Sequence, residues 1–174
     1  MSAPVKASGV LGFSPPHAAL VFLLLVTPIC AWVAWSDLKT MKIPNRAVLT
    51  LLAVFALAGP LLLPFDVWLW RWAQFALVLV LGVVLNAVAH FGAGDAKFGA
   101  AMAPFFAPAD TTLALLLLAA FLLGAFAAHR LVRAVPPLRD LAPDWVSWHR
   151  ADFPLGLALV GTLWAYLALA AFTA

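Results

Sequence analysis

Long apolar segments repeat along the whole chain, separated by short polar stretches. Five of the six segments approach the roughly 17–25 residues that a membrane-spanning helix needs. The fourth contains Pro104 and Pro108 and is shorter. At about 1.5 Å per residue it covers only part of a hydrocarbon core roughly 30 Å thick. The segments occupy residues 18–35, 47–63, 72–91, 98–109, 112–129 and 153–173. This pattern predicts an all-α membrane helix bundle with about six transmembrane helices.

The basic residues lie in the polar gaps and indicate how the chain crosses. Cytoplasmic loops of membrane proteins carry an excess of Lys and Arg. Eight of the ten basic residues share one side if the chain crosses twice between Lys97 and Arg130, with a turn near Pro108–Asp110. Both termini are then predicted outside, and the fourth segment must cross. The eight are Lys39, Lys42, Arg46, Lys97, Arg130, Arg133, Arg139 and Arg150, whereas Lys6 and Arg71 lie outside.

The chain length of 174 residues suits one membrane-embedded domain, residues 1–174. Residues 1–17 are expected to form a poorly structured tail. Residues 130–152 are expected to form a cytoplasmic loop along the membrane interface, with Trp145 and Trp148 as anchors. His129 and His149, each beside an arginine, are expected at the same interface.

Composition excludes several classes of protein. Hydrophobic residues make up 66% of the chain and charged residues 10%, which is far from a soluble globular domain. The basic residues form no patch with interleaved aromatics, so no nucleic-acid partner is expected. Cys30 is the single cysteine, which excludes an internal disulfide and a cysteine zinc site. No His and Asp set has metal-ligand spacing, so neither a metal nor another cofactor is expected.

Two aspartates carry the strongest chemical signal. Asp37 ends the first apolar segment and Asp95 precedes the fourth, so two crossings return the chain to the same side. Paired carboxylates cleave peptides when one, ionised, takes a proton from water and the other, protonated, polarises the scissile carbonyl. A helix N-terminus favours an anion, which makes Asp95 the expected base and Asp37 the acid. Taken singly, each fits an ordinary interfacial residue: Asp95 as a helix cap and Asp37 as a solvated loop residue.

The glycines around Asp95 add to this signal. The stretch Gly92-Ala93-Gly94-Asp95 places flexible backbone beside an acid. Glycine permits close approach of a substrate strand and backbone dihedrals that other residues resist.

Three stretches of the chain resemble the signatures of one family, the type IV prepilin peptidases. Asp37-Leu38-Lys39-Thr40-Met41-Lys42-Ile43-Pro44-Asn45 resembles the first signature, and Gly92-Ala93-Gly94-Asp95-Ala96-Lys97 resembles the second, Gly-x-Gly-Asp-x-Lys. Phe153-Pro154-Leu155-Gly156 resembles the Pro-x-Gly that opens the last helix of these enzymes. The three occur in order over about residues 20–173.

The resemblance implies a membrane aspartic endopeptidase that cuts the leader from prepilin-like proteins at the cytoplasmic face of the bacterial inner membrane. It makes Asp37 and Asp95 the catalytic pair, with Gly92 and Gly94 shaping the loop around Asp95. Lys97, Pro154 and Gly156 match motif positions and are expected to be structural.

The expected partners are a prepilin-like substrate, the lipid bilayer and the pilus assembly machinery. The chain resembles the short, peptidase-only branch that serves tight-adherence (Flp) pili, for which methylation of the new N-terminus is not expected. A different class stays open: a non-enzymatic assembly or ion-transport subunit that uses the same aspartates, since intramembrane acids also relay ions.

Overall fold

A computed structural model describes residues 11–12, 15–89 and 92–173. Within these ranges the regular structure is helical and contains no β-strand, which confirms the predicted all-α class. In chain order the elements are α1 (Pro16–Thr40), α2 (Asn45–Leu62), α3 (Phe65–Ala89), α4 (Ala93–Met102), the 3-10 turns η1 (Ala103–Phe105) and η2 (Pro108–Asp110), α5 (Thr111–Ala134), α6 (Pro136–Arg139), the 3-10 turn η3 (Val146–Trp148) and α7 (Gly156–Phe172).

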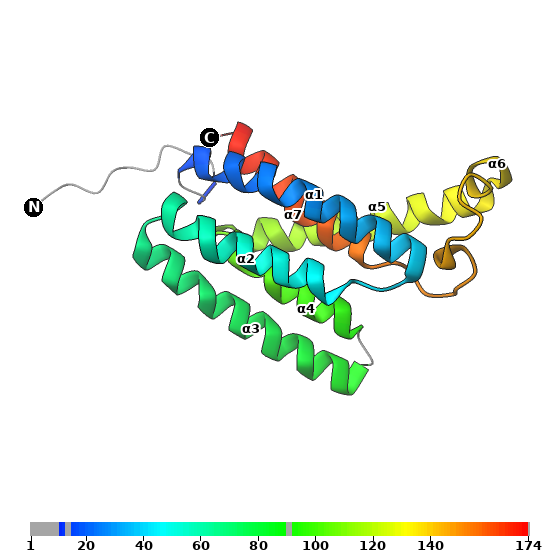
Figure 1. Ribbon diagram of the computed structural model, residues 1–174, viewed down its shortest axis with the longest axis horizontal. Helices are drawn as coiled ribbons and strands as arrows, with labels where there is room; N and C mark the ends of the chain where they lie inside the picture. The colour runs from blue at the N-terminus through cyan, green and yellow to red at the C-terminus, as the bar shows by residue number, and fades with distance from the viewer. Residues whose placement is uncertain (1–10, 13–14, 90–91, 174) are drawn as a thin grey trace, which may run out of the picture.

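The long helices alternate in direction. Figure 1 shows α1, α3 and α5 running one way along the molecule and α2, α4 and α7 returning. Four helices in the described part of the chain are long and apolar enough to cross a membrane, and α7 is a shorter apolar helix. The four cover His17–Thr40, Asn45–Leu62, Phe65–Ala89 and Pro108–Ala134. The alternation agrees with the parity argument, while six crossings and the side of each loop stay predictions.

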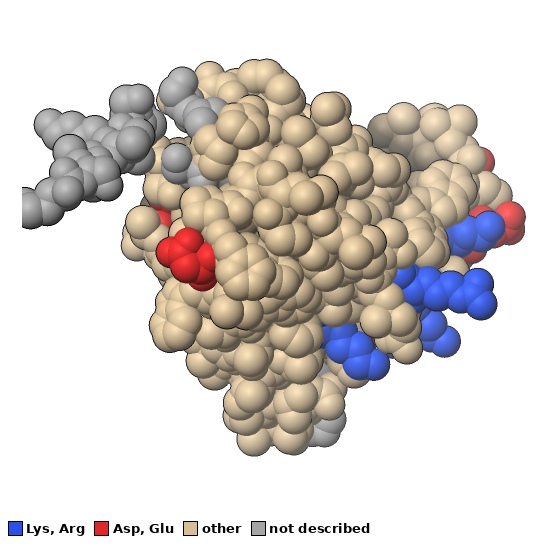
Figure 2. Space-filling model, turned by 60° about the vertical axis from the view of Figure 1, so that its left-hand side comes forward, with Lys and Arg blue, Asp and Glu red and all other residues tan. Residues whose placement is uncertain are grey.

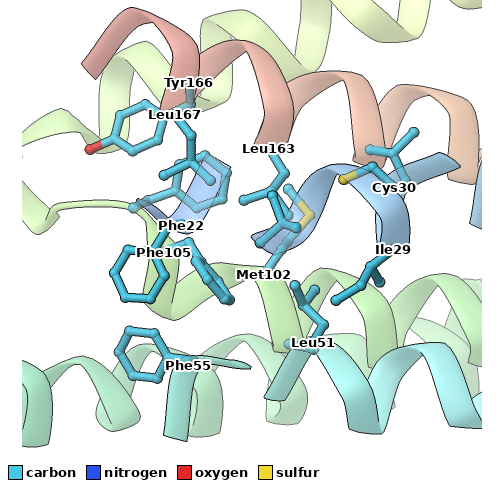
Figure 3. Packing of buried hydrophobic residues seen from close by; sticks show 14 of the residues in the cluster. Phe22, Ile29, Cys30, Leu51, Phe55, Met102, Phe105, Leu163, Tyr166 and Leu167 are labelled. Atoms are coloured by element: carbon cyan, nitrogen blue, oxygen red, sulfur yellow. The ribbon is translucent and has the colours of Figure 1, made fainter. Parts of the chain in front are cut away.

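The core forms where four elements face one another. Phe22, Val26, Ile29 and Val33 repeat at helical spacing along α1 and are buried. Figure 3 shows such residues of α1 meeting others from α2, the α4–η1 segment and α7. Three phenylalanine rings interlock there, since Phe22 lies 6.1 Å from the ring of Phe55 and 5.2 Å from that of Phe105. Large apolar side chains on α3 and α5 are mostly exposed, as expected where a helix faces lipid.

The fourth apolar segment is not one helix. It breaks into α4, η1 and η2, because Pro104 and Pro108 cannot donate backbone hydrogen bonds. Irregular backbone persists at membrane depth only where protein groups satisfy it. Here the Arg71 guanidinium donates to the Pro104 carbonyl at 3.3 Å, and the Ala107 N–H donates to the Tyr166 hydroxyl at 2.9 Å. The turn predicted near Pro108–Asp110 is present as η2.

The start of α3 corrects the sequence analysis. The third apolar segment was expected to begin at residue 72, but α3 begins at Phe65, so Arg71 is helical and 2% exposed. The membrane side of Arg71 stays a prediction. The aromatic stretch before Arg71 is itself helical and packs on α2. Trp68 fills the space over Gly59, and its Nε1 donates to the Phe55 carbonyl at 3.1 Å.

A buried polar network closes this end of the bundle. The Tyr166 hydroxyl donates to Oδ2 of Asp110 at 2.7 Å, and the Gly12 N–H donates to Oδ1 at 2.8 Å. The network therefore fixes η2 to α7. The remainder of the predicted tail, residues 1–10 and 13–14, lies outside the described residues, while α1 already begins at Pro16.

The loop that was expected over residues 130–152 begins later in the chain than predicted. α5 continues to Ala134, so Arg130 and Arg133 are helical and the loop begins at residue 135. His129 is 4% exposed and thus buried within the protein, while its place at the membrane interface stays a prediction. On the face shown in Figure 2, Lys and Arg gather at one end of the molecule, where some Asp lie beside them, and a broad uncharged surface separates this end from the Asp at the other. This separation agrees with the charge asymmetry expected of a membrane protein.

Candidate active site

Asp37 lies in the last turn of α1 and contacts Gly156, the last residue of the third motif. Its side chain is 4% exposed, and Oδ2 accepts a hydrogen bond from the Gly156 N–H at 2.7 Å. Gly156 is the first residue of α7, and the first backbone N–H groups of a helix have no partner within it. A Cβ at Gly156 would lie 2.7 Å from Oδ2 and 3.1 Å from Cγ of Asp37. Only glycine therefore allows this contact.

Asp95 lies in the first turn of α4, with Gly92 in the N-cap position. A Cβ at Gly92 would overlap Oδ2 of Asp95, so this glycine makes room for the carboxylate. Gly94 differs, because a Cβ there would make an ordinary contact 3.5 Å from Cβ of Ile43. The two glycines of the motif thus have different roles.

The expectation that glycines supply unusual backbone dihedrals is not met. Among the described residues no glycine has a positive φ, and Met41 alone does, at φ 55° and ψ 38°. Met41 ends α1 in the left-handed conformation and donates its N–H to the Asp37 carbonyl at 2.8 Å. Left-handed backbone costs a non-glycine residue roughly 1–2 kcal/mol. Some strain is therefore stored next to Asp37.

Hydrogen bonds hold the loop after α1 in place. The Ser36 hydroxyl donates to the Lys42 carbonyl at 2.9 Å, which closes the turn. Lys97 Nζ donates to Oδ1 of Asn45 at 3.3 Å, which joins the start of α4 to the start of α2. Lys97 thus links the first two motifs, consistent with its expected structural role.

Both aspartates line one cavity of about 290 Å³. The rest of its lining also comes from the first two motifs: Met41, Lys42, Ile43, Asn45, Gly92, Ala93, Gly94 and Lys97. The structure therefore brings together Asp37, Asp95, Gly92, Gly94 and Lys97, the site residues predicted from sequence. Gly156, expected to be only structural, touches Asp37 directly, and its place in Pro-x-Gly was the signal that pointed to it.

The cavity changes the ionisation of Asp95, which lies outside the four candidate spans. Burial and, to a smaller extent, the negative charge of Asp37 together raise the pKa of Asp95 from 3.8 to about 6. Because the two carboxylates interact, their protons are lost in coupled steps. The pair can therefore hold one proton and one negative charge at pH values up to about 6. Among the described residues no cluster of His, Cys, Asp or Glu suits a metal ion.

Fold and site define the chain as a multi-pass membrane protein with a carboxylate pair between helix ends. The model of the type IV leader peptidase family matches residues 7–128. This match spans most of the chain, which therefore belongs to the type IV leader peptidase family and to the peptidases. Comparisons with curated proteins and with solved structures find no match. The matched range ends before Gly156. The hydrogen bond between Gly156 and Asp37 is therefore an observation independent of the family match.

Proposed function

We propose that this protein is an aspartic endopeptidase that removes the leader from Flp-type prepilins at the cytoplasmic face of the bacterial inner membrane. The observation that carries the proposal is the shared cavity of Asp37 and Asp95, two acids distant in sequence that lie at helix ends. Membership of the leader peptidase family supplies the substrate class.

In the proposed reaction Asp95 is the general base. It takes a proton from water, which attacks the scissile carbonyl, while protonated Asp37 donates a hydrogen bond to that carbonyl oxygen. The Gly156 N–H holds Oδ2 of Asp37, which leaves Oδ1 to carry the proton. The tetrahedral intermediate then collapses as a proton passes to the leaving amine. The negative charge of Asp37 helps to raise the pKa of Asp95 to about 6, so this value describes the loss of the second of the two protons of the pair. We therefore expect kcat to fall as pH rises through about 6, because the pair then holds no proton for the acid.

The test is cleavage of a purified Flp-type prepilin by the purified chain in detergent, with the new N-terminus identified by mass spectrometry. Asp37→Asn and Asp95→Asn should each lower kcat on the order of a thousandfold. Asp144→Asn, at an exposed position, is the matched control and should cut normally. A cleaving Asp37→Asn or Asp95→Asn variant contradicts the dyad mechanism. A wild type that binds ions and cuts no prepilin favours the transport alternative.

Membrane orientation has a separate test. Reporter fusions at Ala109 and at Pro136 flank α5 and should report opposite sides, with Pro136 in the cytoplasm. Fusions that report the same side contradict the proposed topology. The purified cleavage assay also tests methylation, which we do not expect. After addition of a methyl donor, the new N-terminus of the cleaved prepilin should have its unmodified mass.

A further inference from the structure

A second, larger hollow lies beside the active site. It is a groove of about 590 Å³ between α5, α7, the last turn of α1 and the loop containing η3. Small residues on α5, including Gly124 and Ala128, hollow it out, and a Cβ at Gly124 would meet nothing within 4 Å. The volume is roughly that of one helical turn with its side chains.

Aromatic stacking builds one wall of this groove. Trp148 stacks on Trp145 at 5.5 Å and on the ring of His129 at 4.9 Å, with 19° between the latter two planes. Trp145 also meets Trp35 of α1 edge to face at 5.3 Å. Trp148 Nε1 donates to the Ala142 carbonyl at 2.9 Å. These contacts fix the loop against α1 and α5, so the groove is preformed.

His129 places an unpaired polar side chain in the otherwise apolar lining of the groove. Its side chain is buried, it lines the groove, and in the described structure neither ring nitrogen has a hydrogen-bond partner. A neutral imidazole offers one donor and one acceptor, and leaving them unpaired away from water is costly. A lipid acyl chain supplies neither group. A peptide supplies both, and the end of a helix exposes unpaired backbone groups.

The groove also adjoins the candidate dyad in two places. Its lining includes Leu38, the residue after Asp37, and Leu157, the residue after Gly156. Consecutive Cα atoms are 3.8 Å apart. A chain segment in the groove therefore lies close to the residues that would cut it.

We propose that this groove binds the end of the substrate's apolar helix next to the cut, with His129 paired to a backbone group there. The inference rests on the proposed function, because it assumes that the substrate is a polypeptide at membrane depth. The apolar walls receive the side chains of the helix, and the His129 imidazole selects a peptide over lipid.

Filling the groove tests the proposal kinetically. Ala128 lines the groove, whereas the adjacent and exposed Ala127 does not. Ala128→Trp should lower kcat/KM for a purified Flp-type prepilin on the order of tenfold, mainly through KM. The matched control Ala127→Trp should leave it unchanged. Equal kcat/KM for the two variants overturns the proposal.

His129 variants separate its polar role from its packing. His129→Phe keeps a ring against Trp148 and removes the hydrogen-bonding nitrogens, so KM should rise severalfold. His129→Gln restores a donor and an acceptor and should recover most of the loss. A His129→Phe enzyme with wild-type KM contradicts the pairing.

Photo-crosslinking tests occupancy without relying on a bulky substitution. A photoreactive residue at Val132, in the groove, should capture the prepilin, and one at the adjacent, 68% exposed Leu131 should not. Capture of lipid alone, or of a second copy of this chain, at position 132 overturns the proposal. If the wild type cuts and the groove variants match their controls, the groove assignment alone fails. If position 132 captures prepilin that is never cut, the proposed reaction alone fails.

Discussion

Replacing Asp95 with asparagine removes a carboxylate that the folded protein disfavours in its charged form. Burial, followed by the negative charge of Asp37, raises its pKa from 3.8 to about 6. Folded protein therefore binds this proton more tightly than unfolded chain does. The free energy of unfolding therefore falls as pH rises from about 4 to about 6, and above that range the full loss is present. Asp95→Asn should lose cleavage and, at pH 7.5, become more stable than the wild type.

The rise of pKa sets the size of this gain. At 1.36 kcal/mol per pH unit, a rise from 3.8 to about 6 corresponds to about 3 kcal/mol. Asp95 is only partly buried, and water screens its charge, which reduces the expected gain to about 1–2 kcal/mol. For a chain of this length, 1 kcal/mol moves Tm by roughly 2–4 °C. The variant should therefore melt about 2–8 °C above the wild type at pH 7.5.

The assay compares thermal unfolding of wild type and Asp95→Asn in one detergent at pH 4 and pH 7.5. Exposed Asp144→Asn serves as the control for loss of a negative charge and should follow the wild type. The advantage of Asp95→Asn should disappear at pH 4, where wild-type Asp95 is protonated. An advantage of equal size at both pH values, or a variant that melts below the wild type at pH 7.5, refutes the electrostatic reasoning.

Four further substitutions probe the contacts around the site and the far end of the bundle. Gly156→Ala should lower kcat about a hundredfold with Tm little changed, because the new Cβ displaces the Asp37 carboxylate and a misplacement near 1 Å costs about that much. In the same cleavage assay Gly92→Ala should lower kcat about tenfold, because the new Cβ clashes with the Asp95 carboxylate. Gly94→Ala should leave kcat within about twofold of the wild-type value. Equal effects of the two would contradict the geometry. Tyr166→Phe should leave two buried partners of its hydroxyl unpaired and destabilise the fold by about 1–3 kcal/mol, measured as a lower Tm, without changing kcat/KM.

Apolar runs and charge asymmetry predicted much of this arrangement. Counting crossings placed Asp37 and Asp95 on one side, and both line the same cavity. The alternation of apolar segments also predicted the helical class and the turn at η2. These features depend on local pattern, which a sequence displays directly.

Other features depend on packing between distant segments. The start of α3 was predicted too late because an arginine among aromatic residues fits a loop equally well until Trp68 is known to pack over Gly59. The burial of His129 follows from the way the loop folds its tryptophans back onto α5. The Gly156–Asp37 hydrogen bond joins residues 119 apart, and no periodicity reports such a contact.

The candidate dyad lies where three helix ends meet, and this arrangement explains how it can hold a single charge. Asp37 ends α1, while Asp95 and Gly156 lie in the first turns of α4 and α7. Helix N-termini carry partial positive charge and unpaired N–H groups, so two of them favour a first negative charge on the pair. Burial and the repulsion between the carboxylates oppose a second. The helix ends thus bias the pair toward one proton and one charge, the state in which one aspartate acts as base and the other as acid.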